Sequence, residues 1–135
     1  MIKRVFAALA VVTLFPTASS AEVVLCKMQD YDRGNFIPKE IIVKVDQKAG
    51  KVVVFDPFIQ LLREKPLHLQ AEITDDRAKF SWKFTDFPLK YNKTGTVSYK
   101  ATYLRDRKRL LMKGFGHGFD NDIRGEGKCA PYKSR

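Results

Sequence analysis

Residues 67–85 have the sequence LHLQAEITDDRAKFSWKFT, in which apolar and polar side chains alternate on both sides of a short polar turn. The apolar positions recur every second residue, and they are Leu67, Leu69, Ala71, Ile73, Phe80, Trp82 and Phe84. A period of two places successive side chains on opposite faces of a strand. Residues 74–77 supply turn chemistry. The stretch therefore predicts a β-hairpin whose aromatic residues belong to a core, with ligand stacking on Trp82 as the minority alternative.

The same pattern extends outward from this hairpin in both directions. Further candidate strands lie at 22–28, 41–45, 52–55, 97–103, 110–115 and 127–129. Turn residues separate them, among them Gly50, which can adopt a positive φ. Seven or so antiparallel strands joined in sequence predict a mainly β fold, a single meander that forms a small barrel or a sandwich.

One segment departs from the strand pattern and predicts a short helix near 57–64. Asp56 followed by Pro57 is typical of an N-cap and first helical turn. An apolar stripe follows and stops before Pro66; it contains Phe58, Ile59, Leu61 and Leu62. We expect this stripe to close one end of the β core, while docking of a partner is the alternative.

The first 21 residues have the organisation of a secretory signal peptide. Lys3 and Arg4 precede an uncharged apolar run at 5–15, and small residues follow up to Ala21. The run is about half as long as the ~20 residues of a membrane-spanning helix. We expect a signal-peptide helix at 1–21, cleavage near Ala21, periplasmic or secreted localisation, and one domain at 22–135 without a stable transmembrane span.

The two cysteines, Cys26 and Cys129, lie near opposite ends of that domain. Export would place them where disulfides form and persist. We expect a bond that ties the first strand to the last, and two buried free thiols are the alternative. Two isolated cysteines do not supply a tetrahedral metal site, so we expect no metal and no other cofactor.

The chain is strongly basic, and removal of the signal peptide would lower its formal charge from +10 to +8 through loss of Lys3 and Arg4. This charge favours an anionic envelope component or an acidic protein as partner. Nucleic acid is not favoured, because no defined aromatic platform accompanies the cations. The first candidate for anion binding is an expected hairpin tip with Arg105, Arg107, Lys108 and Arg109. A solvated turn that discourages edge aggregation is the alternative.

A second candidate site is the glycine-rich stretch at 116–127, with the polar residues His117, Asp120, Asp122 and Arg124. Its carboxylates could bind calcium, but Arg124 stands where an oxygen ligand belongs and Pro131 where the last acidic ligand belongs. A structural turn is the preferred interpretation. His117 and Asp120 as general base and orienting partner form the enzymatic alternative, which is not favoured because no catalytic pattern accompanies them.

The most specific motif ends the chain, at residues 124–129, RGEGKC. With the signal, the early cysteine and the hairpins, it is similar to small uncharacterised secreted or periplasmic bacterial proteins, which implies export and no established activity. The plan also resembles lysozyme-inhibitor barrels of the bacterial envelope. Their Tyr-x-Cys-x-x-Gly signature is absent around both cysteines, and a basic chain would repel a basic lysozyme.

These observations favour a non-enzymatic exported binding or envelope-associated module for an anionic partner. A lipocalin-like carrier with a small apolar ligand near Trp82 is one alternative. An enzyme centred on His117 and Asp120 is the other.

Overall fold

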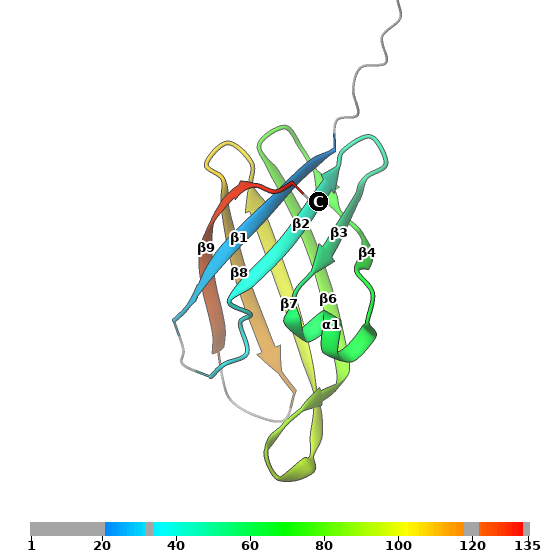
Figure 1. The fold of residues 1–135 in the computed structure, drawn as a ribbon, viewed down its shortest axis with the longest axis vertical. Helices are drawn as coiled ribbons and strands as arrows, with labels where there is room; N and C mark the ends of the chain where they lie inside the picture. Colours follow the sequence, from blue (N-terminus) through cyan, green and yellow to red (C-terminus); the bar gives the residue numbers. More distant parts are fainter. Residues whose placement is uncertain (1–20, 32–33, 118–121, 134–135) are drawn as a thin grey trace, which may run out of the picture.

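The computed structural model describes residues 21–31, 34–117 and 122–133, and it consists mainly of antiparallel strands (Figure 1). The elements in chain order are β1 (Glu22–Asp30), β2 (Glu40–Asp46), β3 (Lys51–Phe55), α1 (Pro57–Arg63), β4 (Leu67–Gln70), β5 (Glu72–Ile73), β6 (Arg77–Pro88), the 3-10 turn η1 (Lys90–Asn92), β7 (Thr94–Leu104), β8 (Arg109–Gly116) and β9 (Asp122–Pro131). The mainly β fold and the short helix near 57–64 are confirmed. The expected signal-peptide helix lies outside the described residues.

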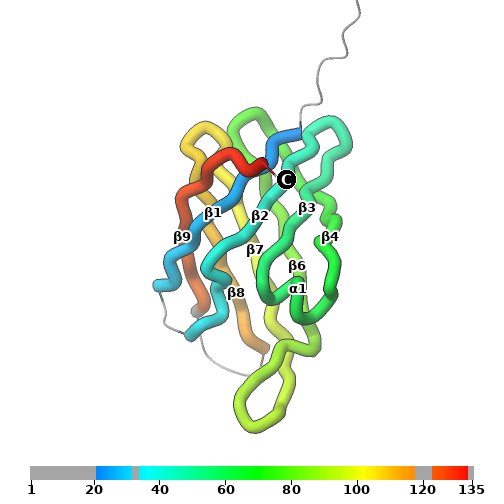
Figure 2. The backbone as a smooth tube through the Cα atoms, in the orientation of Figure 1, coloured from blue at the N-terminus to red at the C-terminus, as the bar shows by residue number. Residues whose placement is uncertain are grey.

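The strands form one sheet in the order β4-β3-β2-β1-β9-β8-β7-β6-β5. Every neighbouring pair is antiparallel, and all pairs except β1 with β9 follow one another along the chain. Figure 2 shows that this meander curls round so that the sheet is nearly closed on itself. The architecture is therefore the barrel, and the sandwich is not formed.

The expected strand over 67–73 is divided at Ala71. Residues on its first part pair with β3, and residues on its second part pair with β6. Between them the Ala71 amide donates a hydrogen bond to the Gly50 carbonyl at 3.1 Å. Because the chain changes partner at this point, one alternating segment becomes β4 and β5 and bridges the two edges of the sheet.

The side chains at alternating positions of the strands are buried in the barrel interior. Tyr99, Tyr103 and Phe84 are among the largest side chains that are fully buried. The Trp82 ring stacks between Phe80, at a centroid distance of 5.9 Å, and Tyr99, at 5.3 Å. The aromatic set of the 67–85 hairpin thus lies in the core, as the period of two predicts.

Helix α1 follows the cap that the sequence indicates, because the Asp56 carboxylate accepts a hydrogen bond from the Ile59 amide at 2.8 Å. Ile59 is fully buried, and Phe58 and Leu62 pack against the core. Leu61, however, is 67 % exposed, which corrects its assignment to the stripe. It lies two residues after Ile59, and that spacing places it on the opposite side of a helix.

The first and last strands are joined by the expected disulfide. Cys26 and Cys129 are direct partners in the pairing of β1 with β9, with a Cα–Cα distance of 4.0 Å. Gly127 lets these two strands approach, since a Cβ at this position would lie 2.5 Å from the Lys27 carbonyl oxygen. The seam between β1 and β9 is thus closed by a covalent bond next to a close backbone contact. No helix in the described part of the chain is long and apolar enough to cross a membrane.

Candidate anion-binding surface

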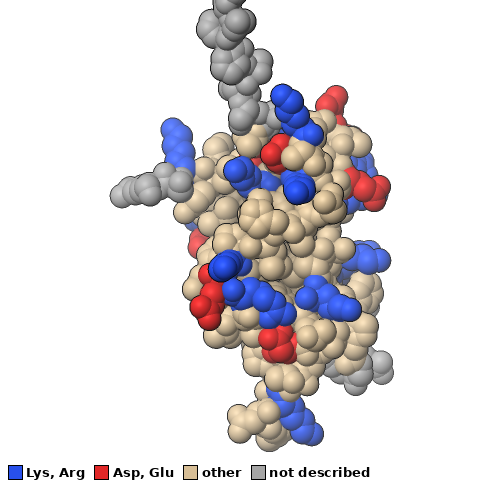
Figure 3. Space-filling view, turned by 90° about the vertical axis from the view of Figure 1, so that its right-hand side faces the viewer, with Lys and Arg blue, Asp and Glu red and all other residues tan. Residues whose placement is uncertain are grey.

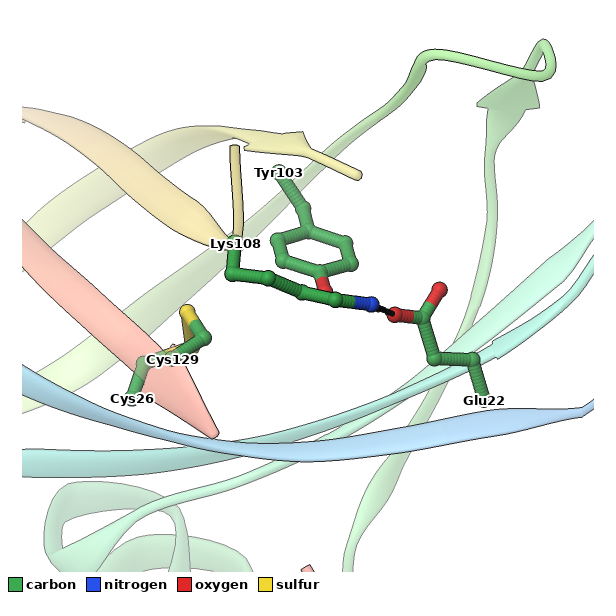
Figure 4. The surroundings of a disulfide bond; sticks show 5 residues. All are labelled: Glu22, Cys26, Tyr103, Lys108 and Cys129. Atoms are coloured by element: carbon green, nitrogen blue, oxygen red, sulfur yellow. Dashed lines mark hydrogen bonds and ion pairs between the residues drawn. A yellow bond between two sulfur atoms is a disulfide. The ribbon is translucent and has the colours of Figure 1, made fainter. Parts of the chain in front are cut away.

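The basic tip predicted at 105–109 lies at the turn between β7 and β8, where Arg105 and Lys108 face Glu22 at the start of β1. Figure 4 shows Lys108 with Glu22 and Tyr103. Arg105 Nε lies 3.4 Å from Glu22 Oε1, and the Lys108 ammonium donates to Oε2. The Tyr103 hydroxyl also donates to Oε2, at 2.8 Å. Burial alone would raise the pKa of Glu22, but these donors outweigh it and hold the pKa below its ordinary value.

The remaining tip residues differ from one another. Arg109 donates from Nε to Oε2 of Glu126 at 2.6 Å, and the Tyr31 hydroxyl donates to the other carboxylate oxygen at 3.1 Å. The Arg109 hydrogen bond holds the pKa of Glu126 below its ordinary value. Arg107 is exposed and forms no ion pair within the described residues. Three of the four tip cations are therefore bound to carboxylates of β1 and β9.

The residues of the predicted polar loop are spread over several places. His117 follows β8 and is exposed, with Nε2 3.2 Å from the Ser98 hydroxyl oxygen. Arg124 lies on the outer face of β9, and Asp122 begins that strand. Asp120 lies outside the described residues. Among the residues that are described, no three His, Cys, Asp or Glu side chains are placed to hold a metal ion.

The outer face of β7, β8 and β9 carries an arrangement that the sequence analysis did not identify. Lys100 is the direct partner of Lys113, and Lys113 is the direct partner of Arg124. All three are exposed. We call these three residues the cation row. Neighbouring strands lie ~4.8 Å apart, and like charges directly opposite each other destabilise a sheet, so this register opposes folding rather than favouring it.

A groove of about 760 Å³ lies beside the cation row, on the outer face between the β4–β5 segment and β8. We call it the outer groove; its lining includes Lys79, Lys100, Lys113, Glu72, Gln70, Ser81, Thr102 and Leu111. Three lysines thus face one carboxylate, and within the described part of the chain none of the four forms an ion pair. The outer groove has a net positive charge together with hydroxyl and amide groups.

Apolar side chains flank the central lysine of the row. Leu111, Lys113 and Phe115 alternate along the outer face of β8, where Leu111 is 38 % and Phe115 45 % exposed. The Lys100 ammonium lies 5.9 Å from the centroid of the Phe115 ring, within the range of a cation–π contact. The surface therefore offers charge, hydrogen-bonding groups and apolar area side by side.

Like charges are also direct partners elsewhere on the sheet, where Lys128 of β9 lies between Lys27 of β1 and Arg109 of β8. Figure 3 shows Lys and Arg, with Asp and Glu among them, on the face that lies to the right in Figure 1. Arg63, at the end of α1, donates to both carboxylate oxygens of Asp86, at 3.0 and 3.1 Å. Such pairs of opposite charge are common on protein surfaces.

Neither the contact of the tip with Glu22 nor the pairing within the cation row could be predicted from the sequence, and the reason is the same for both. Glu22 is separated from Lys108 by 86 positions, and Lys100 from Arg124 by 24, so neither relation produces a local pattern. Only the strand register brings these residues together. The chain matches no protein-family model, no curated protein and no solved structure.

Proposed function

We propose that the protein is an exported, non-enzymatic binding module that recognises an anionic partner through its basic surface. Export is supported by the signal-peptide organisation of residues 1–21, with cleavage near Ala21, and the disulfide is compatible with that destination. The partner is an anionic envelope component or an acidic protein. The basic surface centres on the cation row and the outer groove.

The observation that carries this proposal is the direct pairing of Lys100 with Lys113 and of Lys113 with Arg124. Folding gains nothing from such like-charge neighbours. A bound anion would neutralise them, so binding would remove a repulsion that the free protein retains. Lys100 and Lys113, the two lysines of the row, form no ion pair within the described residues.

The tip at 105–109 is the second candidate surface for the same partner. Arg105 and Lys108 are both bound to Glu22, so one of their two charges is offset within the fold. Arg107 is exposed and can add to the attraction of an approaching anion. We therefore expect Arg107 to affect the rate of association more than the affinity.

The test is binding to immobilised anionic polymers of several chemistries, with elution by increasing salt. We expect retention at low salt and early elution for a variant that reverses the cation row, Lys100→Glu, Lys113→Glu and Arg124→Glu. The control reverses three exposed lysines elsewhere, Lys44→Glu, Lys48→Glu and Lys51→Glu, which changes the net charge equally. Equal elution of the two variants, or no retention of the native protein on any of the polymers, contradicts the proposal.

A second candidate function, a carrier of a small ligand inside the barrel, is favoured by one observation. Trp82 is 6 % exposed, and its indole Nε1 has no hydrogen-bond partner in the described residues. Buried donors in native proteins usually have a partner, and a ligand acceptor would supply one. Titration with apolar ligands should then change the Trp82 fluorescence, and an unchanged spectrum across the series contradicts a carrier role.

A further inference from the structure

We propose that the cation row and the outer groove together bind a linear acidic polysaccharide that crosses β7, β8 and β9. This inference rests on the proposed function and names the partner of that same surface. Three features support it: the length of the cation row, the uncharged polar groups in the outer groove, and the apolar side chains on β8 beside Lys113.

The length of the row favours a ligand with several negative charges. Lys100, Lys113 and Arg124 stand on three successive strands. With strands ~4.8 Å apart, the row extends over about 10 Å. A single phosphate or carboxylate group could contact all three cations only if their flexible side chains converged on it. A polymer with an acidic group on successive sugar units can place one charge near each of them.

The uncharged groups of the outer groove suit a ligand rich in hydroxyl groups. Ser81 and Thr102 provide hydroxyls, and Gln70 provides an amide. These side chains both donate and accept hydrogen bonds, as sugar hydroxyls do. Glu72 in the same groove can accept hydrogen bonds from sugar hydroxyls, and Lys79 is its direct partner in the pairing of β5 with β6.

The apolar residues on β8 suit the faces of sugar rings. Phe115 and Leu111 are both partly exposed, on either side of Lys113. Sugar rings present C–H groups that pack against aromatic and aliphatic side chains. A phosphate polymer has no such face. Lys100 lies against the Phe115 ring, so an acidic sugar could contact cation and ring together.

The shape of the surface argues against two other polyanions. A bilayer is flat, but the outer groove is a hollow bounded by the β4–β5 segment. Single-stranded nucleic acid stacks successive bases on several aromatic side chains, while Phe115 is the aromatic residue exposed on the outer face of β7, β8 and β9 in the described part of the chain. Acidic polysaccharide is therefore the partner that the surface fits best.

The test measures dissociation constants of the oxidised protein for five probes by calorimetry at one salt concentration. The probes are a polygalacturonate oligosaccharide, a heparin oligosaccharide, polyphosphate, a single-stranded oligonucleotide, and vesicles that contain phosphatidylglycerol. The variants are Phe115→Ser, the double variant Lys100→Gln and Lys113→Gln, and the control Tyr91→Ser. Tyr91 is 89 % exposed at the β6–β7 turn, away from the groove.

We expect an acidic oligosaccharide to bind most tightly. The double lysine variant should weaken binding at least tenfold, Phe115→Ser about fivefold or more, and Tyr91→Ser less than twofold. Phe115→Ser should leave the weaker binding of polyphosphate unchanged, which separates a sugar contact from a general loss of charge or fold. Circular dichroism of each variant establishes that the barrel is intact.

Two results overturn this inference but not the proposed function. One is binding that follows charge alone, with polyphosphate equal to the saccharides and Phe115→Ser without effect. The other is tighter binding to the vesicles or the oligonucleotide with the same dependence on the two lysines. Absence of binding to all five probes at low salt overturns both the inference and the proposed function.

Discussion

The two groups of cations on this barrel have opposite surroundings. At the β7–β8 turn, Arg105 and Lys108 meet the carboxylate of Glu22, which comes from the other end of the chain. On the outer face of the same strands, Lys100 and Lys113 meet each other. The first group joins β1 to the rest of the sheet, and the second adds repulsion. A dense run of basic residues in the sequence is thus not by itself a binding site. The better candidate is the surface around Lys100 and Lys113, which form no ion pair within the described residues.

The largest expected loss of stability comes from removing the disulfide that closes the seam between β1 and β9. In the chain-entropy model, the Cys26–Cys129 bond closes a loop of about 100 residues and contributes about 4.7 kcal/mol. We expect the variant with Cys26→Ala and Cys129→Ala to lose stability of this order, measured by urea unfolding. Reduction of the native protein should give a similar loss. An unchanged unfolding midpoint in both experiments contradicts a closing role for the seam.

The disulfide-closed seam and the fold class could be predicted from the sequence, because the features that indicate them are either local in the sequence or have only one possible partner. A period of two around Trp82 gave the core positions, Asp56 before Pro57 gave the helix start, and the chain contains a single pair of cysteines. The cation row was not accessible, because its register depends on every turn and irregularity between its strands. One such irregularity is the bulge between Phe84 and Phe87 in β6. A slip of one residue moves a side chain to the other face, so pairing across strands cannot be read from spacing alone.

The next largest change in stability concerns Asp56, a carboxylate that, in contrast to Glu22, forms no ion pair within the described residues. Asp56 is 4 % exposed, and burial raises its pKa from 3.8 to about 6. Between these values the folded state binds more protons than the unfolded state, so this group lowers stability as pH rises. We expect Asp56→Asn, which can keep the cap, to be more stable than the native protein at pH 7 by up to about 3 kcal/mol. The difference between the two proteins should shrink toward pH 4, and a constant difference contradicts this sign.

Glu22 should show the opposite dependence on pH. Its pKa is lowered by its donors, so its contribution is present above the ordinary value of 4.5 and is lost as pH falls through the lower, folded pKa. We expect Glu22→Gln to lose about 1–2 kcal/mol at pH 7, because a charged acceptor for several donors is removed. Unfolding at pH 7 and pH 3 measures both quantities. Glu40→Gln is the control, since Glu40 is exposed on β2 and forms no ion pair within the described residues.

The smallest expected change in stability is a gain, in contrast to the loss expected for Glu22→Gln. It tests the cation row directly. In Lys113→Glu, the central residue of the cation row becomes an acid between Lys100 and Arg124, so two repulsive cross-strand pairs become attractive. Cross-strand pairs are worth roughly 0.2–1 kcal/mol each. We therefore expect this variant to be more stable than the native protein by about 0.5–1 kcal/mol at low salt, with a smaller gain as salt screens the charges.

The same substitution should weaken the binding of acidic polymers. A gain in stability with a loss of binding is the signature of a surface kept for its partner at the expense of the fold. Arg105→Glu provides the comparison at the tip, where the new acid would face Glu22 and stability should fall. If Lys113→Glu and Arg105→Glu change stability in the same direction, the two groups of cations are electrostatically alike. The register of β7, β8 and β9 would then give no reason to place the binding surface on the outer face.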